Sequence, residues 1–349
     1  MSKLTALPES KINDLFRQIG SNKTLYIPVT NNSGKADFVQ WTEGAVLSDE
    51  LKTVRSAKDF FFPKSECLVK YQRKGLEVKV EDPRKELEDF VIFGVRACDA
   101  KSFEIIDNVY LNMQPVDSYY KNRRDHGTVV TLACSEVEQT CFCSTYGIDA
   151  ANPAGDVSSW KADGYFYFKA NTDKGTKFLD TVKSLLEEKD DLAVEEQKKS
   201  IKEKTDALPF AHLDLSKFTG KDMLKIFNSK VWDKMSKTCL GCGTCTYVCP
   251  TCMCFDVRDF DSGNGITQVR CWDSCMFSDF TQMAAANPRL TQKERFRQRF
   301  MHKLMYYPMA HNNLFACVGC GRCLNSCPAN LNIVKVIKAF NEETEEGDK

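Results

Sequence analysis

Two cysteine segments with the same spacing set the strongest limits on how this 349-residue chain folds. Residues 239–250 read CLGCGTCTYVCP, and residues 317–328 read CVGCGRCLNSCP. Glycines between the cysteines allow each segment to bend tightly, and a proline after the fourth cysteine turns the chain out of the loop. The fold therefore has to accommodate two similar cysteine loops that are separated by a long insert.

The shared pattern, Cys-x2-Cys-x2-Cys-x3-Cys-Pro, is the spacing of bacterial two-cluster iron-sulfur proteins. Three thiolates of each segment bind one 4Fe-4S cluster and the fourth binds the other cluster, so one copy alone is incomplete. We assign the first cluster to Cys239, Cys242, Cys245 and Cys327. We assign the second cluster to Cys317, Cys320, Cys323 and Cys249. Zinc sites and thioredoxin-like Cys-x-x-Cys pairs are the alternatives, but neither predicts two complete segments.

The composition indicates a soluble, cytoplasmic protein. The 17 cysteines are odd in number and clustered, which does not suit a disulfide framework. The first residues contain no apolar core of signal-peptide length, and no run approaches the roughly 18 apolar residues of a membrane span. Lysine plus arginine equals aspartate plus glutamate at 48 each, so we expect no general nucleic-acid binding.

The sequence predicts an α+β protein in which an N-terminal α/β domain is followed by a helical ferredoxin-like domain that holds two 4Fe-4S clusters. Short apolar runs at 24–29, 89–98, 128–134 and 165–170 predict strands of a domain that covers residues 1–175. Glu and Lys alternate in a predicted charged helical connector at 176–232. The dicluster domain covers 233–335, with predicted helices at 275–288 and 291–308, and a polar tail covers 336–349.

Four further cysteines predict a third 4Fe-4S cluster in the N-terminal domain. Cys98 and Cys134 each follow a predicted strand, and a helix-like segment lies between the strands, so the strands are expected to be parallel. Their carboxyl ends then meet at the edge where open α/β sheets bind ligands, and Cys141 and Cys143 follow in the next loop. The alternative is that these are small buried core residues.

The remaining cysteines form a rival set for a third metal site. This set consists of Cys252, Cys254, Cys271 and Cys275. Two of them directly follow Cys249 and Pro250, which favours packing around the dicluster over binding of a separate metal. Cys67 stands alone and is expected to be structural.

The amino-acid sequence around the cysteine segments resembles that of a known family. CPTCMCFDV, RCWDSCMFSDFTQMA and ERFRQRFMHK, together with CVGCGRC, are similar to the beta subunits of cytoplasmic sulfhydrogenases and related 4Fe-4S dicluster electron-transfer subunits. The A subunit of anaerobic sulfite reductase is a more distant relative. FFFP, GVRACDAKSFEIID, DSYYKNRRD and CFCSTYG extend the resemblance over about residues 59–330. Cys271 and the alanines at 284–286, where the family often has glycines and a histidine, depart from the pattern.

The resemblance implies a subunit of anaerobic metabolism that relays single electrons. One expected partner is a flavin/NAD(P)-binding subunit, and the other is a further redox subunit such as a hydrogenase or a heterodisulfide reductase-like module. The residues agree, because the chain has no G-x-G-x-x-G after a strand, no P-loop, no H-E-x-x-H and no visible triad. Whether the chain is an enzyme is left open, since these absences favour an electron-transfer subunit over a self-sufficient enzyme.

Two hypotheses concern residues outside the cysteines. In the alternative function, the chain is a subunit of a sulfite or polysulfide reductase that itself contacts a small oxidant through Arg96, Asp99 and Arg123. In the segment KERFRQRFMHK, helical spacing places Arg295, Arg299 and His302 on one face. That face either docks an acidic partner or is simply solvated.

Overall fold

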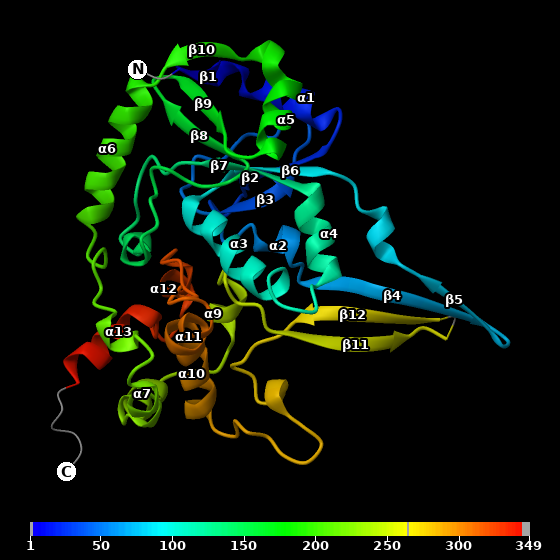
Figure 1. Ribbon diagram of the computed structural model, residues 1–349, viewed down its shortest axis with the longest axis vertical. Helices are drawn as coiled ribbons and strands as arrows, with labels where there is room; N and C mark the ends of the chain where they lie inside the picture. Colours follow the sequence, from blue (N-terminus) through cyan, green and yellow to red (C-terminus); the bar gives the residue numbers. More distant parts are fainter. Residues whose placement is uncertain (1–2, 264, 344–349) are drawn as a thin grey trace.

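The computed structural model describes residues 3–263 and 265–343. Figure 1 shows a large sheet with its helices in the upper half, the cysteine segments and the C-terminal helices in the lower half, and a second sheet that projects to one side. The combination of sheets and helices confirms the mixed α and β class expected from the sequence. No helix among the described residues has both the length and the apolar character needed to cross a membrane.

The described residues of the upper half form an eight-stranded sheet of order β10-β1-β9-β8-β7-β6-β2-β3. In sheet order the strands are β10 (Glu187–Asp190), β1 (Lys3–Pro8), β9 (Tyr165–Ala170), β8 (Val157–Ala162), β7 (Gly127–Leu132), β6 (Phe90–Val95), β2 (Thr24–Thr30) and β3 (Ala36–Gln40). The strands from β2 through β6 and β7 to β8 are parallel, and the outer pairs are antiparallel. The four strands predicted from the sequence are confirmed as β2, β6, β7 and β9.

Helices cover both faces of this sheet, which explains the continuous apolar runs of its central strands. All six residues of β6 and of β7 are buried, as expected for parallel strands that are covered on both sides. One face packs against α1 (Ile12–Gly20) and α5 (Asp173–Val182). The other face packs against α2 (Lys58–Phe61), α3 (Ala97–Tyr110) and α4 (Ser118–His126). The predicted βαβ order is confirmed, because α3 connects β6 to the neighbouring parallel strand β7 by way of α4.

The predicted connector at 176–232 is wrong for its first part. The boundary at 175 falls inside α5, whose Phe178 and Val182 are buried against the sheet, and β10 adds an edge strand to β1. Charged residues are compatible with β10 because an edge strand faces water. The true connection is α6 (Leu192–Asp206), which runs down one side of the molecule (Figure 1) towards α7 (Met223–Asn228) and α8 (Val231–Ser236).

The predicted polar tail at 336–349 is also wrong for its first residues. Helix α13 (Ile333–Glu342) is amphipathic and buries Val336, Ile337 and Phe340 in the core of the lower half. Its apolar stripe has helical spacing, which the polar character of the following residues concealed. The part of the predicted tail at 344–349 lies outside the described residues.

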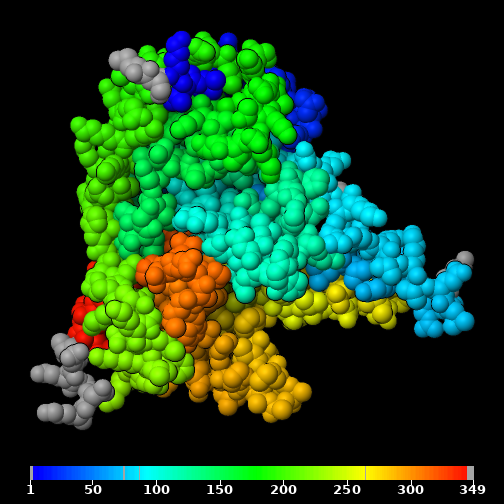
Figure 2. Space-filling model, viewed as in Figure 1, coloured from blue at the N-terminus to red at the C-terminus, as the bar shows by residue number. Residues whose placement is uncertain are grey.

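A second sheet, of order β11-β12-β4-β5, forms a projecting arm. It joins β4 (Ser65–Lys74) and β5 (Glu77–Glu81) of the N-terminal half to β11 (Phe255–Asp261) and β12 (Ile266–Trp272), which lie between the two cysteine segments. Figure 2 shows this arm extending away from the body of the molecule. The sequence reasoning missed β11 and β12, although the sequence Ser-Gly-Asn-Gly between them is of a type that favours a turn.

Of the two helices predicted in the insert, one is wrong and one is confirmed. Residues 275–288 contain only a 3-10 turn at Asp279–Thr281, and the Asn287 side chain bonds Ser278 O and Arg289 N, which competes with a helical backbone. The second prediction is confirmed as α10 (Gln292–Met301), which continues through a π-helical segment (His302–Tyr306) into α11 (Tyr307–Ala310). A Thr291 and Glu294 capping box begins α10.

Candidate iron-sulfur sites

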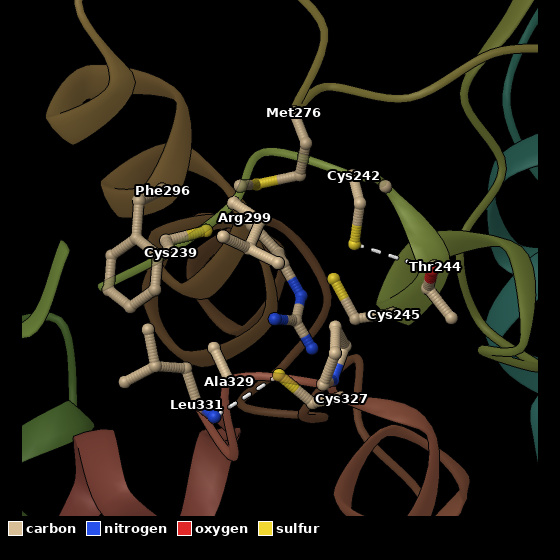
Figure 3. A pocket seen from close by; sticks show the side chains of 13 residues that line it. Cys239, Cys242, Thr244, Cys245, Met276, Phe296, Arg299, Cys327, Ala329 and Leu331 are labelled. Atoms are coloured by element: carbon tan, nitrogen blue, oxygen red, sulfur yellow. Dashed lines mark hydrogen bonds between the residues drawn. The ribbon is translucent and has the colours of Figure 1, made fainter. Parts of the chain in front are cut away.

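The first cavity is lined by the four cysteines assigned to the first cluster. Figure 3 shows them around one space: Cys239, Cys242, Cys245 and Cys327. Cys239 and Cys242 belong to the loop that leads into α9 (Thr244–Tyr247) and Cys245 lies in the first turn of α9, whereas Cys327 directly follows α12 (Arg322–Ser326) of the other segment. The structure therefore brings a cysteine of the second segment to the three cysteines of the first segment.

Neutral groups donate to the sulfur atoms of this first cavity. Gln292 Nε2 lies 3.3 Å from Cys239 Sγ, and the amide of Leu331 lies 3.1 Å from Cys327 Sγ. The Thr244 side chain contacts Cys242 Sγ at 3.4 Å and lowers the pKa of that thiol. Cys242 is exposed, so one corner of the cavity reaches the protein surface.

The second set of cysteines is more deeply buried. Its members are Cys317, Cys320, Cys323 and Cys249. Burial raises the pKa of Cys317 and Cys323 and raises that of Cys320 to about 11, and the nearby charge of Cys249 raises all three further. These four sulfurs are thus close enough to interact, and they need positive charge nearby if they are to be thiolates.

Two buried cations on one helix supply that charge. Lys303 Nζ lies 3.3 Å from Cys249 Sγ and also donates to Thr251 Oγ1 and to Ala316 O. Arg299, one turn earlier, is 4% exposed, and its guanidinium points into the first cavity (Figure 3), where Nε has no hydrogen-bond partner among the described residues. Burial opposes both charges, but the neighbouring cysteines outweigh it and raise the pKa of each cation.

These two cations test whether the sites suit iron-sulfur clusters. Neither forms an ion pair with a carboxylate within residues 3–263 and 265–343, and an uncompensated buried charge costs several kcal/mol. A cluster held by four thiolates is anionic and accepts hydrogen bonds at its sulfurs, so it would compensate both charges and satisfy Arg299 Nε. The cysteine sets and their surroundings therefore fit 4Fe-4S clusters.

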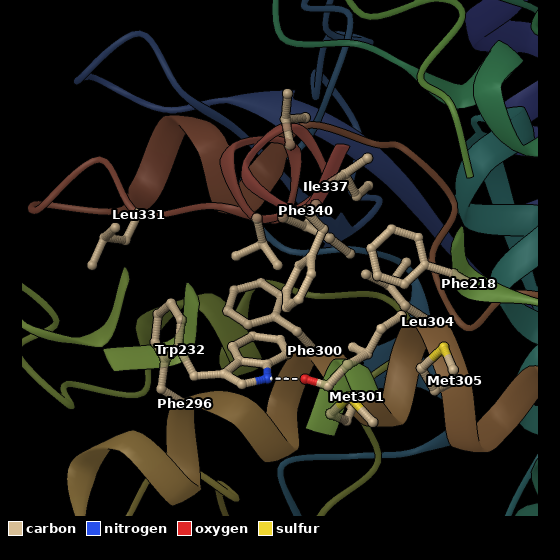
Figure 4. Close-up of a cluster of buried hydrophobic side chains, with 14 of the residues drawn as sticks. Phe218, Trp232, Phe296, Phe300, Met301, Leu304, Met305, Leu331, Ile337 and Phe340 are labelled. Carbon is tan, nitrogen blue, oxygen red and sulfur yellow. Dashed lines mark hydrogen bonds between the residues drawn. The ribbon is translucent and has the colours of Figure 1, made fainter. Parts of the chain in front are cut away.

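Apolar side chains of the same helix hold the cations in place. Phe296 and Phe300 pack against Trp232 and Phe340 (Figure 4), and Trp232 Nε1 donates to Ile226 O at 2.6 Å. Because this face anchors the helix in the core, its neighbouring face must point Arg299 and Lys303 towards the sulfurs. The predicted docking face is therefore wrong.

The other members of that predicted face are also engaged with the protein. Arg295 donates to the carbonyls of Met276, Arg289 and Leu290. Burial lowers the pKa of His302 to about 4, so this imidazole is neutral at pH 7. None of these side chains forms the exposed cationic patch that the sequence suggested.

A third cavity lies at the carboxyl ends of β6 and β7. It is lined by all four cysteines that the sequence placed there, Cys98, Cys134, Cys141 and Cys143, and also by Cys320 of the second set. Cys98 lies in the first turn of α3, and the amide of Cys134, just after β7, donates to Ala150 O at 3.0 Å. Lys52 Nζ lies 3.6 Å from Cys141 Sγ and 3.0 Å from Cys320 O, and it also pairs with Glu138.

The third cavity is packed directly against the second cysteine segment. The amide of Phe142 donates to Gly319 O at 2.9 Å, and a Cβ on Gly319 would lie 2.3 Å from Phe142 O. Arg322 and Asp99 form a buried ion pair across the same boundary, with Nη2 and Oδ2 2.8 Å apart. Only glycine permits this approach, and Cys320 lies between the second and third sets as a result.

The rival cysteines are divided by the structure. Cys252 contacts Cys249, and Cys254 contacts Cys275, whereas Cys271 lies on β12 with its Sγ 3.8 Å from Ser65 Oγ. Within the described part of the chain, no group of three or more Cys, His, Asp or Glu side chains is arranged around a single metal ion. A single ion requires ligands that converge on one point, whereas cluster cysteines bind separate corners.

The residues proposed to bind a small oxidant have other roles in the structure. Arg96 donates to the carbonyls of Leu51 and Ala133, Asp99 pairs with Arg322, and Arg123 pairs with Glu66. These contacts count against the hypothesis that the three side chains bind sulfite or a polysulfide, which stays a prediction.

Sequence reasoning missed the buried lysines. They are Lys52, Lys303 and also Lys58, which is fully buried. Lys58 Nζ donates to Cys249 O and Cys252 O. It also lies 3.6 Å from the centre of the Trp272 ring. Lysine is seldom buried, so nothing in the local sequence distinguishes these residues from surface lysines. Only their closeness to a cysteine site in space identifies them.

Comparison with known proteins agrees with these sites. Residues 238–331 match the family model of the 4Fe-4S dicluster domain. Over 334 residues the chain is 32% identical to sulfhydrogenase 2 subunit beta of Pyrococcus furiosus, an alignment that covers 94% of this chain and 96% of the relative. Identity at this level along nearly the whole of both chains shows that the protein belongs to the family of sulfhydrogenase beta subunits.

Proposed function

We propose that this chain is the iron-sulfur electron-transfer subunit of a cytoplasmic oxidoreductase complex, and that it relays single electrons between a flavin/NAD(P)-binding subunit and another redox subunit. The family and the dicluster domain support the coarser statement, an iron-sulfur electron-transfer subunit of a multisubunit complex. Free, clustered cysteines suit a reducing compartment.

The observation that carries the proposal is the adjacency of three cysteine sets. Each 4Fe-4S cluster, when bound, accepts and releases one electron. Cys327 belongs to the second segment but lines the first cavity, and Cys320 belongs to the second set but lines the third cavity. The second set is thereby connected to both of the others, so electrons pass from the third site through the second to the first, or in reverse.

The two ends of this path differ in their access to partners. At one end, Cys242 of the first set is exposed, which gives a partner close approach to that cluster. At the other end, the third cavity lies beyond the carboxyl ends of the central strands β6 and β7, which is where open α/β sheets bind their ligands. We propose that the two partner subunits contact these two ends.

A second candidate function is direct reduction of a small oxidant such as sulfite or a polysulfide. One observation favours it: a cavity lined by Lys101, Tyr146 and Asn313 reaches Cys317 of the second set. Burial raises the pKa of Tyr146, so its hydroxyl stays protonated and able to donate. A small molecule in this cavity would lie close to the second cluster.

Electrochemistry of the anaerobically purified chain separates these functions. An electron-transfer subunit gives reversible one-electron waves without any added substrate. A reductase gives a catalytic current only when sulfite or polysulfide is added. A redox-silent chain that contains iron would contradict both proposals.

A further inference from the structure

Two donors at equal distances from sulfur distinguish the first and second cysteine sets. Gln292 Nε2 lies 3.3 Å from Cys239 Sγ in the first set, and Lys303 Nζ lies 3.3 Å from Cys249 Sγ in the second. The amide is neutral, whereas the ammonium carries a full charge. Charge-assisted hydrogen bonds are roughly twice as strong as neutral ones, so the two contacts are unequal in effect.

The Lys303 ammonium is held rigidly at this position. Lys303 is 5% exposed, and Thr251 Oγ1 at 2.8 Å and Ala316 O at 3.1 Å accept its other hydrogens. It lies in the π-helical segment that follows α10, a local irregularity that is frequent at functional sites. The lysine therefore cannot turn away to water, and its charge acts on Cys249 through a medium of low dielectric constant.

The other buried cations do not offset this asymmetry. Arg299 points into the first cavity (Figure 3), but Cys245 of the first set and Cys323 of the second both raise its pKa, so its charge acts on both sets. Arg322 lies beside Cys320, but Asp99 neutralises it, and Glu138 pairs with Lys52 in the same way. Lys58 donates to main-chain carbonyls of Cys249 and Cys252 rather than to a sulfur.

We infer that Lys303 makes the second cluster the higher-potential member of the dicluster pair, so that the first electron to enter the pair resides on the cluster held by Cys249, Cys317, Cys320 and Cys323. The inference rests on the proposed function. Reduction adds a negative charge to a cluster, and a fixed positive charge bonded to one of its sulfurs stabilises that product. Lys303 is thus a positioning residue that sets which cluster of the pair holds the first electron.

A redox titration of the complete, anaerobically purified chain, followed by electron paramagnetic resonance, tests this inference. Lys303→Met should lower the ratio of reduced to oxidised first-reduced centre by tenfold or more at a fixed potential, which corresponds to 59 mV or more for a one-electron couple. Lys303→Gln keeps a hydrogen-bond donor but loses the charge, so the potential of the first-reduced centre should lie between those of the native chain and Lys303→Met. Lys303→Arg should restore most of the native potential.

Gln292→Leu is the matched control. It removes the neutral donor to Cys239 and should shift only the later-reduced centre of the pair, by less than tenfold in its ratio of reduced to oxidised form. If Gln292→Leu instead shifts the first-reduced centre, the order is reversed and the inference is overturned, whether or not the Lys303 variants retain iron. It is equally overturned if Lys303→Met keeps its iron and an unchanged potential. Failure of the proposed function is distinguishable, because the unaltered chain would then lack the two reversible centres altogether.

Discussion

The first cavity and the third cavity each gather four cysteines, but the chain builds them in different ways. In the first, a short loop places three cysteines together, and only Cys327 comes from elsewhere. In the third, two strand ends and a following loop supply the cysteines, so the eight-stranded sheet must form before the site exists. One site is thus encoded mainly by local spacing and the other by topology. The second cysteine segment lines both cavities, through Cys327 in the first and Cys320 in the third, so the two sites share one piece of structure.

The largest effect is expected from removing the C-F-C pair. Cys141→Ser combined with Cys143→Ser should lower iron by about four atoms of about twelve per chain, because one 4Fe-4S cluster is lost. The signals of the other two clusters should remain, since their eight cysteines are untouched. Iron analysis together with paramagnetic resonance measures both. An unchanged iron content would mean that these cysteines are structural and that the third cavity holds no cluster.

A large loss of stability is expected when the buried ion pair between the two sites is opened. Arg322→Leu leaves Asp99 charged and buried without its partner, which should cost about 3–5 kcal/mol of unfolding free energy. Denaturant unfolding of the anaerobic protein measures this loss. The double variant Arg322→Leu with Asp99→Leu should recover a substantial part of it. A double variant as unstable as the single one would show that the pair is not the source of the effect.

A smaller effect is expected where the backbones of the two sites meet. Gly319 has φ +59°, and an added Cβ would lie 2.3 Å from Phe142 O. Gly147 has a similar φ of +67°, but a Cβ added there would meet no atom within 4 Å, so Gly147→Ala measures the backbone strain alone. Gly319→Ala should be less stable than Gly147→Ala by about 1–3 kcal/mol, the usual cost of overpacking. Equal losses in thermal unfolding would contradict the close packing described here.

The smallest effect is expected at the exposed corner of the first cavity. Thr244→Val keeps the side-chain shape but removes the hydroxyl that contacts Cys242 Sγ at 3.4 Å. The loss of one such hydrogen bond should lower stability by about 0.5–1.5 kcal/mol. Only the first cluster's resonance signal should change. If the resonance signal of the third cluster also changed, the first and third sites would be more tightly coupled than their different origins in the chain suggest.

Sequence reasoning succeeded where chemistry depends on spacing or on strand order. The repeated pattern places Cys327 with Cys239, Cys242 and Cys245, and the structure brings these four residues to one cavity. The βαβ argument likewise brought Cys98 and Cys134 to one sheet edge, because parallel strands share the direction of their carboxyl ends. The first inference depends on the spacing of residues in a short segment, and the second depends on the strand order within one βαβ unit.

Sequence reasoning failed where the role of a residue depends on distant packing. The sequence placed Arg299 on a helical face that either docks a partner or is solvated, yet the packing of Phe296 and Phe300 against Trp232 turns Arg299 inwards, and Lys303 with it. The hairpin of β11 and β12 was missed because charged residues interrupt its apolar ones and β11 is almost entirely exposed, and the hairpin is held by pairing with β4, about two hundred residues earlier in sequence. No local pattern reports such long-range contacts.

The proposal of an electron path through both regions is tested most directly by counting the electrons that the chain accepts. A stoichiometric reductive titration of the anaerobic, iron-replete chain should consume about three electrons, one for each 4Fe-4S cluster, with all three returned on reoxidation. A count of two would restrict the path to the dicluster and remove the site at the edge of the sheet. A count of one or none would contradict electron transfer through the chain.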